Sequence, residues 1–131
     1  MDNSFYDTLN TKVVKARKAI ESLYQGTCTV TEHQKVTKAN KSTGFKDVVV
    51  LDKQPCRLSF KNITDTDQAD NAASAVVQVI VLFIAPDVSI APGSKITVTQ
   101  NDVTTDYQQS GMPAMYDTHQ EIILDLFREW S

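Results

Sequence analysis

The chain has 131 residues, of which 41% are hydrophobic and 22% are charged. These proportions are ordinary for a soluble domain, so they argue against global disorder and a fibrous class, and the length fits a single domain over residues 1–131. The net charge of −3 argues against a dedicated nucleic-acid-binding domain, because such domains usually carry a basic excess that neutralises phosphates.

Positive and negative charges are separated along the chain. Residues 1–61 hold 11 Lys and Arg against 6 Asp and Glu, whereas residues 62–131 hold 2 against 10. Such polarity suits head-to-tail packing of identical subunits, because a basic surface on one copy can meet an acidic surface on the next. The same pattern also fits solvated faces that lie close together in one folded monomer.

The first 25 residues carry the clearest helical pattern. Apolar residues recur at intervals of three and four between Asn3 and Tyr24, which places them on one face of a helix, and Gly26 can adopt the left-handed conformation that ends it. We expect this face to cover the β structure. The opposite face, which is either solvated or a partner contact, carries Lys12, Val14, Lys15 and Lys18.

Residues 26–131 are predicted to be mainly β. From Thr27 onward the period changes to two and β-branched residues become frequent, as in half-buried strands. The predicted strands cover 27–37, 47–52, 55–60, 75–84, 95–100 and 103–108, with a polar turn-rich segment at 38–46. The run from Val48 to Leu51, which includes Val49, is too apolar for a strand with one wet face. It is therefore buried or lies at an interface.

Two further connections and the last segment complete the pattern. Residues 61–74 have no periodicity and are predicted to be a long mobile loop that carries Asp65, Asp67 and Asp70. The pair Asn101-Asp102 is a two-residue connection of hairpin type. Residues 119–130 fit both a helical stripe and a strand alternation, and the pattern alone slightly favours the helix.

No combination of residues indicates catalysis or a cofactor. The two histidines, His33 and His119, lack metal-ligand spacing, and the four glycines form no phosphate-binding loop. The segment from Asp65 begins like a calcium loop but lacks the required glycine and the closing glutamate. We therefore expect no enzymatic activity, no cofactor and no metal site.

The N-terminal residues and the cysteines indicate where the protein is made. Residues 1–10 are polar and not of signal-peptide type, so we expect synthesis in the cytoplasm. The longest apolar run, at 75–86, is shorter than the roughly 20 residues that cross a bilayer, so we expect no membrane partner. Cys28 and Cys56 lie in predicted strands and are interpreted as buried free thiols.

Four stretches together resemble one phage protein family. They are Gln54-Pro55-Cys56-Arg57-Leu58-Ser59-Phe60, Pro92-Gly93-Ser94-Lys95-Ile96-Thr97-Val98, Thr105-Asp106-Tyr107-Gln108-Gln109-Ser110-Gly111 and Thr118-His119-Gln120-Glu121. In order and spacing they are similar to the head-completion, head-to-tail connector (head-closure) proteins of phages and prophages of Gram-positive bacteria. The resemblance covers roughly residues 20–131.

The resemblance implies a small antiparallel β-barrel with an N-terminal α-helix, assembled as a homo-oligomeric ring. Such a ring lies at the head-tail interface of the virion, below the portal or adaptor protein and above the tail or tail-terminator protein. It retains packaged double-stranded DNA, which passes without sequence-specific binding. The family also favours a strand for 119–127, since the C-terminal segment is expected to close the sheet.

Two sets of residues follow as candidate sites of a ring subunit. An assembly interface would expose apolar surface beyond the monomer core, and Val14, Val49, Ile123 and Phe127 are the candidates, together with the lysines of the helix. The loop with Asp65, Asp67 and Asp70 is the candidate gate of the DNA channel. A monomeric tail-associated binding module or adaptor without a gating role is the alternative function.

Overall fold

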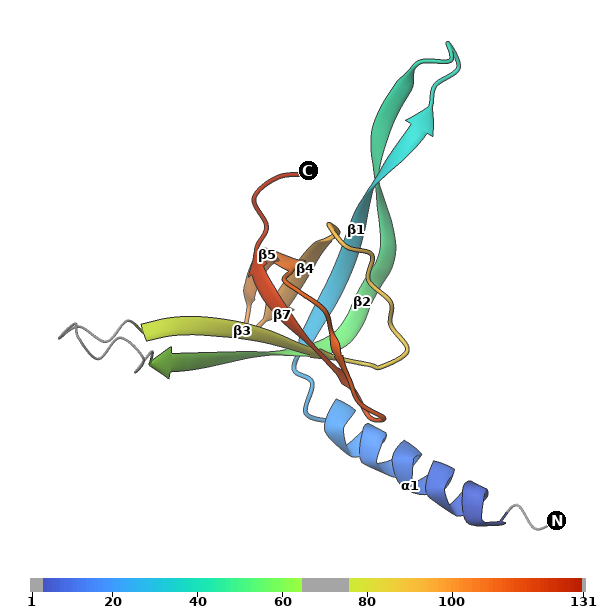
Figure 1. The fold of residues 1–131 in the computed structure, drawn as a ribbon, viewed down its shortest axis with the longest axis vertical. Coiled ribbons are helices and arrows are strands. Elements are labelled where there is room, and N and C mark those ends of the chain that lie inside the picture. The colour runs from blue at the N-terminus through green and yellow to red at the C-terminus, as the bar shows by residue number, and fades with distance from the viewer. Residues whose placement is uncertain (1–3, 65–75, 131) are drawn as a thin grey trace.

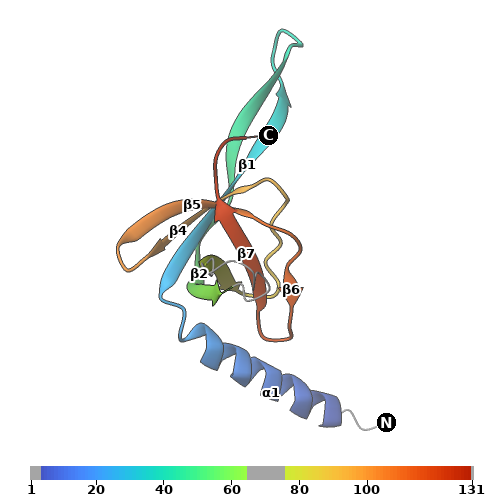
Figure 2. The ribbon, with the colours of Figure 1, turned by 60° about the vertical axis from the view of Figure 1, so that its left-hand side comes forward.

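A computed structural model describes residues 4–64 and 76–130. It contains one helix, α1 (Ser4–Glu21), followed by the strands β1 (Gly26–Thr37), β2 (Thr43–Thr64), β3 (Val76–Ile84), β4 (Lys95–Gln100), β5 (Val103–Gln109), β6 (Ala114–Met115) and β7 (Gln120–Leu126). The predicted mainly β fold with one N-terminal helix is confirmed. Figures 1 and 2 show a central sheet from which α1 and two long strand pairs extend.

The strands form one antiparallel sheet that closes in a ring. Their order is β3-β2-β1-β4-β5-β7-β6, and an additional pairing of β3 with β7 joins the two sides. In this pairing Ile80 lies opposite Leu124 and Ile84 opposite Gln120. The expected closure by the C-terminal segment is confirmed: 120–126 is a strand, and the helical interpretation of its apolar residues is wrong.

The inward-facing side chains of the strands form the core. Every second residue of β1 and β4 is buried along the paired stretch, as the period of two predicts. The core members are Cys28, Val30, Cys56, Leu58, Leu82, Ile84, Ile96, Val98, Tyr107, Ile122 and Leu124. Cys28 and Cys56 are buried free thiols, as predicted. A hydrogen bond with Cys28 and burial raise the pKa of the Cys56 thiol, which keeps it protonated.

β2 is a single strand of 22 residues, where the sequence predicts two short strands between a turn and a loop. Residues 43–46 and 61–64 are part of the strand and not of the flanking connections. The predicted break at 53–54 is a bend inside it. Lys53 has a positive φ of 51°, and the register shifts opposite Cys28 to Thr31 place bulges in β2 itself, because β2 runs from Gln54 to Val49 over the same stretch. This bend lets one strand pair with β1 in its first part and with β3 in its second.

The β4–β5 hairpin is formed as the sequence predicts. Asn101 and Asp102 connect the two strands, and both have positive φ, 52° and 62°. These are the conformations of a type I′ turn, which asparagine and aspartate tolerate better than most residues.

Gly26 begins β1 and does not cap the helix, so that expectation is wrong. The helix ends earlier, at Glu21, and tighter turns follow in which Leu23 and Tyr24 donate backbone hydrogen bonds to Ile20 and Glu21. A Cβ atom on Gly26 would lie 3.1 Å from the Thr99 carbonyl oxygen. Glycine is therefore needed for a close approach of strands and not for a left-handed turn.

Just before the first residue of β1, the side chain of Gln100 makes the hydrogen bonds to β2 that a further β1 residue would otherwise make. Gly26 pairs with Cys56, so the backbone of Leu58 lies beyond the end of β1. Gln100 Oε1 accepts a hydrogen bond from the Leu58 N–H at 2.8 Å, and Gln100 Nε2 donates to the Leu58 carbonyl at 3.3 Å. One side-chain amide therefore satisfies both backbone groups of Leu58.

Replacing Gln100 with alanine should destabilise the closed sheet. The change leaves the Leu58 N–H and carbonyl without these partners, so we expect a loss of about 1–3 kcal/mol in the free energy of unfolding, measured in urea. Gln78→Ala is the matched control, because Gln78 is exposed on β3, and its cost should stay below about 0.5 kcal/mol. Equal losses for the two variants would contradict this role of Gln100.

Candidate assembly interface

Three extensions carry most of the candidate interface. α1 projects from one end of the sheet (Figure 1). The second extension is the β1–β2 arm, residues 32–50, in which β1 residues 32–37 pair only with β2, because the pairing of β1 with β4 ends at Thr31. The third is the β2–β3 arm, where β3 residues 76–79 pair with β2 but not with β7. Each extension offers surface that the core does not use.

α1 does not cover the sheet, so the expectation that it forms a lid is wrong. Its predicted partner face is exposed as a whole: Lys12, Lys15 and Lys18 are exposed, and Val14 keeps 50% of its surface accessible. The face expected to pack is also accessible at Leu9, which is 43% exposed. A helix that buries so little in its own chain has apolar surface left for a partner.

One ion pair connects α1 with the loop after β3. Arg17 Nη2 donates to Asp87 Oδ1 at 2.8 Å, while Arg17 Nε donates to Glu21 Oε1 at 2.9 Å. The hydrogen bond to Glu21 is the main cause that raises the pKa of Arg17. Because these groups are accessible to solvent, the pair orients the helix more than it stabilises the fold.

The other predicted interface residues differ in accessibility. Val49, on the β1–β2 arm, is 56% exposed, and Ile123, on the outer side of β7, is 48% exposed. Phe127, just after β7, is only partly exposed because it contacts Trp130 edge-on, with ring centroids 4.9 Å apart. Val49 and Ile123 are thus free to contact a partner, whereas part of the Phe127 ring is already used within the chain.

An aromatic cluster that sequence reasoning missed fixes the base of the β1–β2 arm. The His33 ring lies between two aromatic rings, with centroids 4.6 Å from Phe45 and 4.9 Å from Trp130 and interplanar angles of 9° and 11°. His33 Nδ1 is 2.9 Å from Asp47 Oδ1, which orients the ring further. The stack joins the arm to residues after the last strand.

Lys95 extends this cluster to β4. Its Nζ lies 5.8 Å from the centroid of Phe127 and 5.7 Å from that of Trp130, within the range of a cation–π interaction. Residues more than 90 positions apart thus meet here, which is why periodicity could not reveal the cluster. The one available signal was that the single tryptophan follows the last strand.

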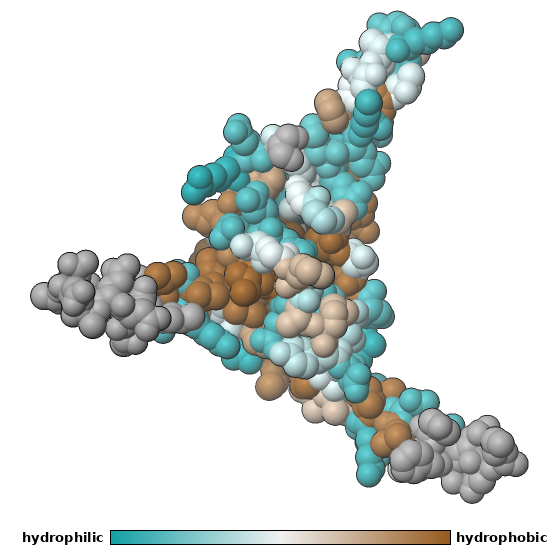
Figure 3. All heavy atoms as spheres, in the orientation of Figure 1, coloured by the Kyte–Doolittle hydropathy of each residue, from teal (hydrophilic) through white to brown (hydrophobic). Residues whose placement is uncertain are grey.

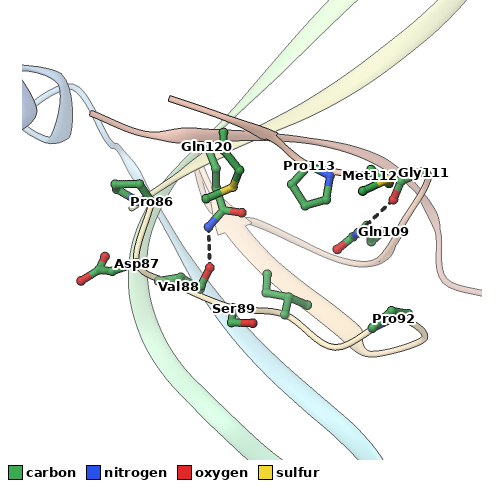
Figure 4. Close-up of a pocket in the computed structure, with 12 residues that line it drawn as sticks. Pro86, Asp87, Val88, Ser89, Pro92, Gln109, Gly111, Met112, Pro113 and Gln120 are labelled. Carbon is green, nitrogen blue, oxygen red and sulfur yellow. Dashed lines mark hydrogen bonds between the residues drawn. The ribbon is translucent and has the colours of Figure 1, made fainter. Parts of the chain in front are cut away.

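An open cleft of about 620 Å³ lies between the loop after β3 and the segment after β5 (Figure 4). Val88, Ile90 and Met112 give it an apolar lining, and Met112 is 91% exposed. At its base Gln120 is buried, and its Nε2 donates to the carbonyls of Ala85 and Val88. The Gln120 nitrogen is therefore already used within the chain, while the Oε1 atom of Gln109, which also lines the cleft, is buried without a hydrogen-bond partner among the described residues.

Hydrophobic residues also gather where β2 and β3 leave the central sheet, whereas the end of the β1–β2 arm is mostly hydrophilic (Figure 3). On the β2–β3 arm Phe60 is 52% exposed and Val77 53% exposed. The β2–β3 arm is therefore the more apolar of the two where it leaves the sheet, and the β1–β2 arm is the more hydrophilic at its end.

The predicted gate residues Asp65, Asp67 and Asp70 lie outside the described residues. Of the predicted loop 61–74, only residues 61–64 are described, and they belong to β2. Within residues 4–64 and 76–130 no group of three or more His, Cys, Asp or Glu side chains could hold a metal ion. In the same ranges, none of the helical structure is long and apolar enough to traverse a lipid bilayer.

Similarity to known proteins is slight. No family model matches the chain, and no curated protein matches it. One solved structure that resembles it is the phage-like element PBSX protein xkdH from Bacillus subtilis, with a TM-score of 0.44 and 10% sequence identity over 76% of this chain and 91% of that chain. At this TM-score and identity the similarity establishes neither a shared fold nor a shared function.

Replacing Trp130 with alanine should loosen the base of the β1–β2 arm. The change removes one side of the His33 stack, worth about 0.5–1.5 kcal/mol, so we expect faster amide hydrogen exchange in residues 32–37 and 43–48. Tyr116→Ala is the matched control, because Tyr116 stacks on His119 with centroids 4.8 Å apart, away from the arm. Unchanged exchange in the arm of the Trp130 variant would show that the stack does not hold it.

Proposed function

We propose that the chain is a structural protein of a phage virion, a head-closure or head-to-tail connector subunit, and not an enzyme. In this role it forms a homo-oligomeric ring below the portal or adaptor protein. The ring retains packaged DNA, lets it pass without sequence-specific contacts and offers the tail or tail-terminator protein an attachment surface.

The observation that carries this proposal is the amount of apolar surface left outside the closed sheet. The core occupies only the inside of the sheet, whereas large hydrophobic side chains remain exposed on all three extensions and around the cleft. They include Leu9, Val14, Phe45, Val49, Phe60, Val77, Met112, Met115 and Ile123. Surface of this kind on several separate elements is typical of a subunit with several neighbours.

The family resemblance supports the same role, since its four stretches fall on the elements that build and close the ring of strands. Residues 54–60 lie in β2, 95–98 in β4, 105–109 in β5, and 120–121 begin β7. Three of these stretches carry core residues, among them Leu58, Val98 and Tyr107. The motifs that carry the resemblance are thus those that a shared closed sheet would require.

The shape of the molecule is also suited to a ring with several layers of contact. Figures 1 and 2 show α1 and the β1–β2 arm leaving the central sheet at opposite ends. A subunit with extensions on opposite sides can contact one protein above and another below while its sheet contacts its neighbours. Imaging of virions by electron microscopy tests the proposal directly: a ring of this chain between head and tail supports it, and absence from the virion contradicts it.

Reversing the charge of α1 should weaken attachment to the connector. With Lys12→Glu, Lys15→Glu and Lys18→Glu the monomer should keep its thermal stability, because these side chains are exposed and outside the core. Incorporation into virions, measured by quantitative immunoblotting, should fall by at least about tenfold. Lys53→Glu with Lys61→Glu, two exposed changes on β2, is the control. Normal incorporation of the α1 variant would contradict a docking role for this face.

Shortening the segment from Thr64 to Ala72 tests the gate. We expect the sheet to fold and the ring to bind, yet full heads should lose DNA before tails attach, because closure by acidic loops must be steric. DNA retention in isolated heads is measured by nuclease protection. If such heads hold DNA as well as wild-type heads, Asp65, Asp67 and Asp70 are not part of a gate.

A further inference from the structure

The β1–β2 arm carries a group of positive charges at its end. Between Gln34 and Lys46 the chain has four lysines and no carboxylate. The four, all exposed, are Lys35, Lys38, Lys41 and Lys46. The nearest carboxylates, at the base of the arm, already have partners: Glu32 accepts a hydrogen bond from Gln34, and Asp47 lies against His33. Within residues 4–64 and 76–130 none of the four lysines forms an ion pair.

The arm also carries apolar side chains and open backbone edges. Phe45 is 62% exposed and Val50 44% exposed, and β1 residues 32–37 have a strand on one side only. Exposed aromatic groups are typical of protein interfaces, where they bury apolar surface. Contacts to a DNA phosphate backbone are instead made by charged and hydrogen-bonding groups, so Phe45 and Val50 favour a protein partner. A protein of net charge −3 would also be repelled by DNA beyond the arm itself.

The matching surface lies on the outer side of β5 and β7. Gln108 pairs with Asp125, and both side chains point away from the core because their neighbours Tyr107 and Leu124 are buried. Asp106, two residues before Gln108 on the same side, accepts a hydrogen bond from Thr97. Asp106 and Asp125 are both exposed. Two carboxylates on adjacent strands thus form an acidic face.

This face combines charge with apolar surface as the arm does. Ile123, which is 48% exposed, lies two residues before Asp125 on the outer side of β7. Two basic residues, Lys95 and Arg128, lie near this face, but Lys95 Nζ lies over the rings of Phe127 and Trp130. Among the described residues neither forms an ion pair with Asp106 or Asp125. An arm with lysines and Phe45 therefore meets a complementary surface in both respects.

We propose that the β1–β2 arm of one copy lies across the β5–β7 face of the next copy. The arm cannot reach the face of its own chain, because the stack of His33 between Phe45 and Trp130 holds its base and the arm points away from the sheet (Figure 1). The contact is head-to-tail: each copy uses its arm on one side and its face on the other. The contact rests on the proposed ring, and its two surfaces are those that join neighbouring subunits of that ring.

A charge-swap experiment tests the contact. The arm variant carries Lys35→Glu, Lys38→Glu, Lys41→Glu and Lys46→Glu, and the face variant carries Asp106→Lys and Asp125→Lys. In a sample of either variant alone, the arm and the face carry charges of the same sign and repel each other. Self-association measured by sedimentation should therefore fall at least about tenfold. An equal mixture should associate again, because each acidic arm meets a basic face and each basic arm an acidic face. Association of either variant alone at the wild-type level overturns the proposal.

Paramagnetic relaxation in solution detects the contact even where association is weak. A nitroxide on a Lys41→Cys chain is mixed with isotopically labelled wild-type chain; Cys28 and Cys56 are buried and leave the new thiol as the accessible one. Broadening at Thr97, Asp106 and Asp125 of the labelled copy is the expected result. Broadening elsewhere, or none, overturns the proposal. Duplex DNA is added in a second measurement, and the proposal is also overturned if the DNA binds the arm and abolishes the broadening on the labelled copy.

The failure of this contact and the failure of the proposed function give different results. If virions contain a ring of this chain but the mixture of variants does not associate, the arm contact is wrong and the ring remains. If virions contain no such ring but the mixture associates and the broadening maps to the β5–β7 face, the connector function is wrong and the arm contact remains. A fold control by circular dichroism accompanies every variant.

Discussion

The pairing of β3 with β7 is the interaction on which the rest of the structure depends. It joins residues 80–84 to residues 120–124 and so converts an open sheet into a ring with an inside. Without it, Leu82 and Ile122, which lie opposite each other and are almost completely buried, would face solvent. The hydrophobic effect of a core this small is sufficient only because both sides of the sheet meet around it.

Much of the sheet could be predicted from the sequence because local pattern determines it. The alternation along β1 and β4 follows from which residues face the core, and Asn101 and Asp102 tolerate the left-handed conformations of the hairpin. The last strand could not be predicted in this way. Ile122 and Leu124 face inward while Ile123 faces out, so the same apolar residues fit a helical stripe until the partner strand is known.

The remaining differences arise from contacts distant in sequence. The bend at Lys53 coincides with bulges of β2 in its pairing with β1, so residues that suggested two strands belong to one. The interface residues on α1 were predicted because they lie opposite the apolar face of the helix. Whether that apolar face packs on the sheet depends on the direction that residues 22–25 give to the helix, which the pattern of the helix does not contain. The aromatic cluster around His33 joins β1, β2 and the C-terminal residues, and no local signal distinguishes such a histidine from an isolated one.

The length of β2 has a mechanical consequence. Its 22 residues, about 70 Å if fully extended, run from the β1–β2 arm through the wall of the closed sheet into the β2–β3 arm. The two arms are therefore the two ends of one strand, with the bend at Lys53 and the bulges of β2 between them. Tension applied at one arm acts on the other along covalent backbone, through the part of β2 that carries the core residues Cys56 and Leu58.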